Sequence, residues 1–165
     1  MIKINEKIPN IPLYIVKDEQ STPIGSHDVL KGKCVLFGIP GAFTKTCSNV
    51  QVPSYVNNRK VFDSLGIDSV VCLAVNDPYV LEVWSQTLDP AHTINFVSDG
   101  NYDFSQSLDL LNDLRKFGMG IRSRRYAMLL EDYTLKLFQL DEIGVGCILS
   151  KADSFIEEVK KYYRT

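Results

Sequence analysis

One cysteine of the chain, Cys47, stands where a thiol could act as a nucleophile. It lies in the stretch GIPGAFTKTCS, residues 38–48, after a glycine- and proline-rich turn that follows an apolar run. If Thr44 or Thr46 caps a helix here, Cys47 falls in the first turn, where unpaired N–H groups and the helix dipole stabilise an anionic sulfur. The alternative is a small buried hydrophobe, because free cysteine is among the most buried residue types.

Residues just upstream of Cys47 could complete a reactive site. Pro40 and Gly41 predict a tight, rigid turn that shields the sulfur from water. The Thr44 hydroxyl could donate a hydrogen bond to the sulfur or to a bound oxygen substrate. An arginine brought in from elsewhere would add a permanent positive charge, which at ~4 Å and an effective dielectric constant of ~20 contributes up to ~4 kcal/mol. These residue types indicate a stabilised thiolate.

Three further cysteines, Cys34, Cys72 and Cys147, accompany Cys47. The chain has no C-x-x-C motif and only two histidines, which disfavours both a zinc site and a thioredoxin-type disulfide oxidoreductase. Cys34 lies in an apolar run and is predicted to be a core thiol. An even cysteine count in a chain of this length is weak evidence for disulfides, so we expect a reducing compartment with one or two working thiols.

Length and composition describe an ordinary globular protein. The chain has 165 residues, 45% apolar and 23% charged, and we expect one domain over residues 1–165. With a net charge of −2 and no long basic run, nothing indicates nucleic acid as a partner. No apolar stretch approaches the ~20 residues of a membrane span, so no membrane partner is expected. The N-terminus lacks a secretory signal pattern, so we expect a cytoplasmic protein, or an organellar one after removal of a leader, and not a secreted one.

Hydrophobic patterning predicts alternating strands and helices. Alternation in the first half favours parallel strands joined by crossover helices, and a late hairpin adds antiparallel edges. The predicted fold class is α/β, a thioredoxin-like fold with a mixed central sheet flanked by helices. Pro53 lies inside the first helix and should kink it. The predicted strands are 33–39, 69–75 and 93–99, the helices are 46–66, 77–88, 102–111 and 150–163, a glycine-bearing loop covers 116–123, and a β-hairpin covers 124–140.

Local signals predict several element ends. Asp77 is a natural cap for the helix that follows it. Ser150 and Asp153 resemble a capping box at the start of the last helix. The hairpin should turn near Asp132 and Tyr133.

The stretch PGAFTKTC matches the P-x-x-x-[T/S]-x-x-C motif of peroxiredoxins, and FGIPGAFTKTCS resembles their type-5, or plant type-II, group in particular. The similarity continues through VNDPYVLEVW (75–84) and GIRSRRYAM (120–128), so it covers almost the whole chain. The resemblance implies a thiol-dependent peroxidase that reduces hydrogen peroxide and alkyl hydroperoxides without a metal or organic cofactor. It also implies a thioredoxin-like fold and a homodimer.

The resemblance assigns roles to matching residues of this chain. Cys47 would be the peroxidatic cysteine, oxidised to sulfenic acid. Thr44 would bond to the thiolate and the peroxide, and Arg125 would be the active-site arginine. Pro40 would shield the pocket and Gly41 would shape the turn. The hydroperoxide would be bound by Gly41, Thr44, Cys47 and Arg125.

The chain departs from the group's pattern at a few positions. Lys45 stands where the group commonly has proline, Gln51 replaces a frequent histidine, and Ser54 replaces a frequent glycine. These departures bear on substrate preference more than on activity. Arg122 and Arg124 do not take the active-site role and are expected to be solvated loop residues.

The reductant of the sulfenic acid has several candidates. Cys72 lies 25 positions after Cys47, as a second cysteine can in plant members, but its apolar strand favours an inert core thiol. Cys147 lies in the region where animal members carry a resolving cysteine. We expect one-cysteine chemistry in which an outside thiol, glutathione with glutaredoxin, or thioredoxin, regenerates Cys47. Alternatives are a redox sensor or relay that passes oxidation from Cys47 to a partner protein, and a binding or chaperone-like module without thiol chemistry.

Overall fold

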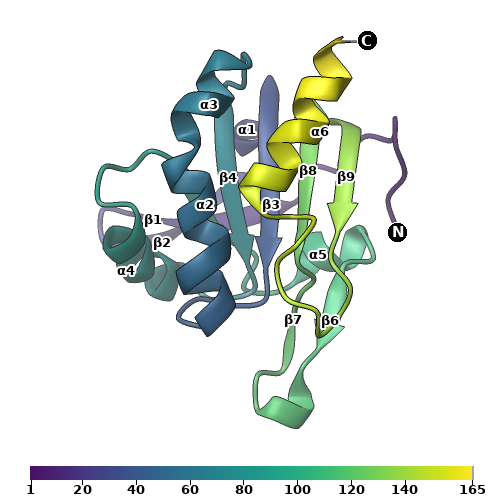
Figure 1. The fold of residues 1–165 in the computed structure, drawn as a ribbon. Coiled ribbons are helices and arrows are strands. Elements are labelled where there is room, and N and C mark those ends of the chain that lie inside the picture. The colour runs from purple at the N-terminus through teal and green to yellow at the C-terminus, as the bar shows by residue number, and fades with distance from the viewer. Residues whose placement is uncertain (165) are drawn as a thin grey trace.

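The computed structural model describes residues 1–164; Thr165, the last residue of the predicted domain, lies outside the described residues. Within this range a seven-stranded sheet runs through the centre in the order β2-β1-β5-β4-β3-β8-β9 (Figure 1). Its strands are β1 (Pro12–Lys17), β2 (Gln20–Gly25), β3 (Lys33–Ile39), β4 (Ser69–Ala74), β5 (Asn95–Ser98), β8 (Tyr126–Glu131) and β9 (Thr134–Leu140).

Parallel and antiparallel pairs share this sheet, as the sequence predicts. β4 lies between β3 and β5 and is parallel to both. On the other side of β3, β8 is antiparallel to β3, and β9 is antiparallel to β8. The β8–β9 hairpin turns at Asp132 and Tyr133, both with positive φ. The predicted strands, the late hairpin and the mixed sheet are confirmed.

The N-terminal hairpin of β1 and β2 is absent from the sequence prediction. It turns at Asp18 and Glu19, whose φ angles of 50° and 62° suit a tight hairpin. Pro12 and Pro23 obscure the strand pattern there. They are tolerated because Pro12 is the first residue of its strand and β2 is an edge strand, where a missing N–H leaves no sheet partner unpaired.

Helices cover both faces of the sheet, and Figure 1 shows α2, α3 and α6 in front of it. Helices α2, α3, α4 and α6 bury one core, which includes Phe62, Trp84 and Phe155. Residues from α5, such as Phe104, join a second core on the opposite face. Asp77 caps α4, as predicted, because its carboxylate accepts the N–H of Val80 in the first turn. The helices are α1 (Ser26–Val29), α2 (Val52–Asn57), α3 (Arg59–Ser64), α4 (Pro78–Leu88), α5 (Asp103–Ser107) and α6 (Ala152–Arg164).

β3 is central to both cores. Val35 and Phe37 face the core under α2, whereas Cys34 and Leu36 face the opposite core. A strand buried on both faces has a continuous apolar sequence, which explains the pattern of residues 33–39. None of the helices within residues 1–164 is long and apolar enough to cross a membrane.

The stretch predicted as one helix over 46–66 is interrupted at its start by a π-helical turn, η1 (Cys47–Gln51). The N–H of Val52 donates to the carbonyl of Cys47, five residues back, instead of four. Pro53 accounts for this, because it has no N–H for the carbonyl of residue 49 and its ring crowds that carbonyl. The predicted irregularity at Pro53 therefore takes the form of a widened turn that begins at Cys47.

A second interruption, at Asn58, separates α2 from α3 and was not foreseen from the sequence. Asn58 leaves the helical region, with φ −99° and ψ 10°. Its side-chain amide donates to the carbonyl of Ser54 at 2.8 Å, which offers the backbone an alternative to the regular helical ladder.

The start of α6 does not use the predicted capping box. The Ser150 hydroxyl donates to the Asp141 carboxylate, and Asp153 pairs with a lysine beside it. The N–H of Ala152, the first residue of α6, donates instead to the Ser54 hydroxyl on α2 at 3.0 Å. The prediction was wrong because a side chain from a distant helix supplies the cap.

The predicted loop over 116–123 forms part of a small arm. Two short strands, β6 (Leu111–Asp113) and β7 (Ile121–Ser123), pair antiparallel, and a 3₁₀ turn, η2 (Arg115–Phe117), lies at their tip. Figure 1 shows this arm projecting beyond the central sheet. The helix observed here, α5, covers only Asp103–Ser107 of the predicted range 102–111, because Leu111 already belongs to β6.

Gly38 allows the close packing of β3 on β8. A Cβ at this position would lie 2.2 Å from the Cε1 atom of Tyr126, its partner in the sheet register. We expect Gly38→Ala to lower the free energy of unfolding by about 1–3 kcal/mol, the usual cost of overpacking a core. Urea denaturation would measure it.

A matched control is Gly100→Ala, whose Cβ would meet only the Ser98 hydroxyl within 3.4 Å, at 3.2 Å. In a Tyr126→Leu background the Gly38→Ala cost should shrink. An equal cost with and without the Tyr126 ring would contradict this account.

Candidate active site

Cys47 follows the carboxyl end of β3 and the turn of residues 40–46, and it begins η1. Its side chain is fully buried against the core under α2. The N–H of Ser48 donates to the carbonyl of Thr44 at 2.9 Å and so opens the helical stretch. Neither predicted cap forms through a side chain: Thr46 makes no capping bond, and the Thr44 hydroxyl donates elsewhere. The placement of Cys47 in a first helical turn is nevertheless as predicted.

The turn before Cys47 is stabilised by a hydrogen bond between two of its own residues. The Thr44 hydroxyl donates to the carbonyl of Gly41 at 2.7 Å. A Cβ on Gly41 would lie 3.2 Å from the Arg122 guanidinium, so the glycine leaves room for that side chain. Pro40 and Thr44 both line the cleft described below. Among the described residues, however, no hydrogen bond joins the Thr44 hydroxyl to the Cys47 sulfur.

Arg125 contacts Cys47 directly. It lies immediately before β8, whose first residue, Tyr126, is paired with Gly38 near the end of β3. This register carries the arginine from a segment 78 positions away to the sulfur, with Nη1 donating to Sγ at 3.5 Å. A fixed guanidinium charge at hydrogen-bonding distance stabilises sulfur as an anion. The sequence prediction that Arg125 lies beside Cys47 agrees with this geometry.

Gln51 anchors the arginine and was noted in the sequence only as a departure from histidine. It is fully buried, one turn after Cys47. Its Oε1 accepts from Arg125 Nη1 at 2.6 Å, and its Nε2 donates to the Gly38 carbonyl at 3.2 Å and to the Ser150 hydroxyl at 3.3 Å. A buried polar side chain with partners on every side is fixed in orientation, so Gln51 holds the guanidinium against the sulfur.

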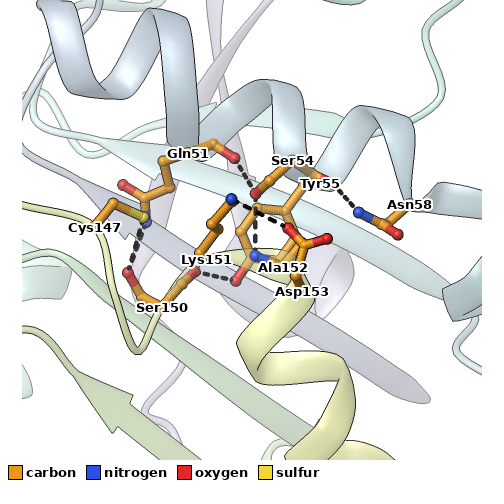
Figure 2. A network of polar contacts seen from close by, with 9 residues as sticks. All are labelled: Gln51, Ser54, Tyr55, Asn58, Cys147, Ser150, Lys151, Ala152 and Asp153. Carbon is orange, nitrogen blue, oxygen red and sulfur yellow. Dashed lines mark hydrogen bonds and ion pairs between the residues drawn. The ribbon is translucent and has the colours of Figure 1, made fainter.

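A loop between β9 and α6 lies next to Gln51, and Figure 2 shows Cys147 and Ser150 of this loop beside it. The Asp141 carboxylate accepts the Ser150 hydroxyl and also backbone N–H groups of residues 148–150. The Tyr55 hydroxyl donates to the Ser150 carbonyl at 2.6 Å. Cys147 lies on the same loop, with its sulfur 3.7 Å from the Ser150 hydroxyl. Ser150 therefore joins the Cys147 loop to Gln51.

The cysteines within the sheet are poor nucleophiles. Cys34 and Cys72 are both buried in strands. Burial raises the pKa of the Cys34 thiol to about 12, and it raises the pKa of Cys72 well above its ordinary value. Since the thiolate is the reactive form, neither thiol should react at neutral pH in the folded protein. This agrees with the core assignment of both residues.

Cys147 is half-buried and lies within electrostatic reach of the site. Burial raises the pKa of its thiol. The hydrogen bond with Ser150 and the charge of Arg125 lower that pKa in part, whereas the charges of Asp141 and Cys47 raise it. The balance leaves the pKa above its ordinary value, so Cys147 is mainly a thiol at neutral pH.

A cleft of about 390 Å³ leads to the site. It lies between the turn before Cys47, the β6–β7 arm and the loop that follows β9. Pro40, Thr44, Thr46 and Arg125 line it, whereas Cys47 does not itself line it. Since Arg125 Nη1 lies 3.5 Å from the sulfur, Cys47 is next to a residue of the cleft wall.

The expectation that Arg122 and Arg124 are solvated is wrong, because both side chains are partly buried. Arg122 Nε donates to the Met119 carbonyl at 2.7 Å and the side chain lies over Gly41. Arg124 Nη2 donates to the Asp141 carbonyl at 3.2 Å, and the side chain lines the cleft. The β6–β7 arm and the Asp141 loop supply these partners, and neither contact was evident from the sequence.

Comparisons with known proteins agree with this geometry. The family model described as Redoxin matches residues 3–145. Peroxiredoxin-2D of Arabidopsis thaliana is 34% identical over 154 residues, covering 92% of this chain and 95% of the relative.

Two solved structures match over nearly their whole length. Reduced Prx3 of Vibrio vulnificus in complex with H₂O₂ superposes with a TM-score of 0.92 at 26% identity, covering 100% of both chains. Peroxiredoxin 5 of Alvinella pompejana gives 0.85 at 31% identity, covering 98% of this chain and 99% of the other. The site places a buried cysteine in contact with an arginine on a thioredoxin-like sheet. Together with these similarities, this shows that the chain belongs to the redoxin family and is a thiol peroxidase similar to the type-II and type-5 peroxiredoxins.

Proposed function

We propose that Cys47 is the peroxidatic cysteine and that Arg125 and Thr44 act beside it on the peroxide. The observation that carries the proposal is the Arg125 guanidinium held 3.5 Å from the Cys47 sulfur by Gln51. The thiolate attacks one peroxide oxygen, an S–O bond forms and the O–O bond breaks. Sulfur loses two electrons and becomes sulfenic acid, while the leaving oxygen takes a proton and departs as water or an alcohol. The atoms balance without a metal or organic cofactor.

The residues around Cys47 would stabilise the negative charge that develops on the peroxide oxygens. Negative charge grows on the leaving oxygen as the O–O bond breaks, and donors aimed at that oxygen lower the barrier. Arg125 has further N–H groups besides those on Gln51 and Cys47. The Thr44 hydroxyl can turn from the Gly41 carbonyl toward a bound oxygen. Pro40 and Gly41 shape the wall that keeps bulk water from the sulfur.

An outside thiol regenerates the enzyme in this proposal. Attack of a thiolate on the sulfenic acid forms a mixed disulfide and releases water, and a second thiol reduces that disulfide. Glutathione with glutaredoxin, or thioredoxin, are the proposed donors. Cys72 is enclosed in the sheet and Cys147 is held on its loop by Ser150, which supports a one-cysteine cycle.

A homodimer and a reducing compartment, cytoplasmic or organellar, complete the proposal. Phe43, in the turn before Cys47, is 62% exposed, and its ring centroid lies 6.2 Å from that of Trp84. Tyr79 and Val83 are exposed one turn apart on the same helix as Trp84. Apolar side chains gathered in this way are typical of an interface, so sedimentation should show twice the chain mass, and a monomer would contradict the dimer.

Four free cysteines are consistent with a reducing compartment.

Cys47→Ser should reduce peroxide consumption to the uncatalysed rate, because serine is not ionised at neutral pH and cannot take up the oxygen. Hydrogen peroxide loss would be followed with glutathione plus glutaredoxin, and separately with thioredoxin. Circular dichroism would establish that the variant remains folded. Undiminished turnover in the serine variant would refute the proposed role of Cys47, and a single oxidation followed by a trapped protein disulfide would favour a relay.

Gln51→Leu should lower kcat/KM for hydrogen peroxide by about tenfold or more, since a hydrogen bond to a charged group is worth roughly 1.5–3 kcal/mol. Gln51→His keeps an acceptor for Arg125 and should recover most of the rate. Unfolding by urea would be measured for both variants. If the two variants lose the same rate, or if rate follows stability alone, Gln51 does not position the arginine.

Cys147→Ser should leave turnover with glutathione and glutaredoxin nearly intact. In the Cys47→Ser protein, iodoacetamide should label Cys147 slowly at pH 7 and faster as the pH rises, because its pKa lies above the ordinary value and the thiolate forms only at higher pH. Cys34 and Cys72 serve as buried controls that label only after unfolding. A Cys47–Cys147 disulfide in peroxide-treated wild type would overturn the one-cysteine cycle.

A further inference from the structure

A second cavity, larger than the cleft beside Cys47, lies at the β1 end of the central sheet. Its volume of about 610 Å³ falls in the range of ~300–1,000 Å³ typical of sites for organic ligands. Residues of β1, β2, β5, α1 and α4 line it, and none of its lining residues also lines the cleft beside Cys47. The peroxidase reaction therefore gives this cavity no role.

The cavity lies where the sheet separates between β1 and β5. Only one register pair, Tyr14 with Ser98, joins these two strands, and beyond it β1 follows β2 whereas β5 follows β4. Figure 1 shows the purple β1–β2 hairpin running across the direction of β3 and β4, with α4 beside it. The N–H of Ser21 donates to the Tyr79 hydroxyl at 3.0 Å and so ties the hairpin to α4. Beyond the single pair, the edges of both strands therefore face the cavity without a strand partner.

Much of the cavity lining is apolar. Ile15, Ile24 and Val29 are half-buried and lie at the margin of one core, whereas Leu81 and Phe96 belong to the core on the other face of the sheet. The cavity thus borders both cores. Half-buried apolar side chains around a space of this size gain by removing water against an apolar ligand.

The charged part of the lining is mainly acidic. Asp28, Asp68 and Glu82 are exposed there, against one lysine, Lys31, and one histidine, His92. Within residues 1–164 none of these five side chains forms an ion pair, and of the three carboxylates only that of Asp68 accepts a hydrogen bond, from a backbone N–H. Even with His92 protonated, three carboxylates face two cations. The unpaired carboxylates are therefore available to a cation.

We propose that this cavity binds a small organic cation, a protonated amine carried on an apolar ring or chain. The apolar part would lie against Ile15 and Ile24, and the ammonium group would lie at the rim among the carboxylates. An anionic ligand would face those carboxylates directly, and a neutral ligand would leave them without a partner. The binding involves no covalent step, and it does not rest on the proposed function of Cys47.

The test compares three indole compounds of similar size and different charge: tryptamine, a cation, tryptophol, which is neutral, and indole-3-propionate, an anion. Amide chemical shifts of the isotope-labelled full chain at pH 7 would report binding. Tryptamine should shift the amides of residues 15–16, 81–86 and 95–97 in a saturable manner. At low salt it should bind about two- to fivefold more tightly than tryptophol, the effect expected of exposed charge pairs, and indole-3-propionate should bind more weakly than tryptophol. Raising the salt to 0.5 M should bring the three affinities together, because the Debye length falls to a few ångströms.

Variants assign the binding to the cavity. Glu82→Gln and Asp28→Asn should each bring the tryptamine-to-tryptophol affinity ratio toward one. Asp103→Asn, which changes an exposed aspartate of α5 that does not line the cavity, should leave the ratio as in the wild type. Ile24→Ser should weaken the binding of both compounds several-fold, with circular dichroism to establish that the variant is folded.

Several results would overturn the inference. They are shifts confined to amides outside the cavity, the absence of a saturable shift with tryptamine, equal affinities for the three compounds, and an affinity ratio unchanged in both charge variants. The Cys47→Ser protein should bind tryptamine as the wild type does, because the cavity does not include the thiol. Failure of this site would leave peroxide reduction by Cys47 untouched, and loss of that reduction would leave this site untouched.

Discussion

The contact between Arg125 and Cys47 is the interaction on which the site depends. The two residues lie 78 positions apart, and the antiparallel pairing of β8 with β3 brings them together. That pairing places Tyr126 opposite Gly38, where the absence of a Cβ makes room for the tyrosine ring. A register shift of one residue would turn Arg125 to the other face of the sheet. The central sheet therefore sets the position of the guanidinium, and the turn before η1 sets the position of the sulfur.

Gln51 connects these two parts to a third. It holds Arg125 through one amide atom, and β3 and Ser150 through the other. Ser150 is in turn fixed by the Asp141 carboxylate, which accepts its hydroxyl. The Ser150 carbonyl also accepts a hydrogen bond from the Tyr55 hydroxyl (Figure 2). Two hydrogen bonds, from Gln51 to Ser150 and from Arg125 to Gln51, therefore connect the loop that carries Cys147 to the arginine.

Much of this arrangement was evident from the sequence. The apolar run 33–39, the turn after it and the first helical turn at Cys47 follow from local pattern, and the late hairpin turns at Asp132 and Tyr133 as predicted. What escaped prediction depends on distant partners. Ser54 caps α6 from another helix, and Ser150 serves Asp141 instead of a capping box. The edge prolines of β1 and β2 hid a hairpin whose placement depends on β5. Periodicity and propensity describe neighbours along the chain, so contacts made only in the folded state lie beyond them.

The partner that Arg125 has at position 51 is neutral, and this matters for the sulfur. A carboxylate there would satisfy the same donor but would cancel most of the guanidinium charge within a few ångströms. An amide oxygen accepts the hydrogen bond and leaves the net positive charge intact. Because the site is buried, that charge is poorly screened by solvent. Gln51 thus fixes the arginine in place while its charge remains directed at Cys47. In the proposed reaction the same charge would also face the oxygen on which negative charge develops as the O–O bond breaks.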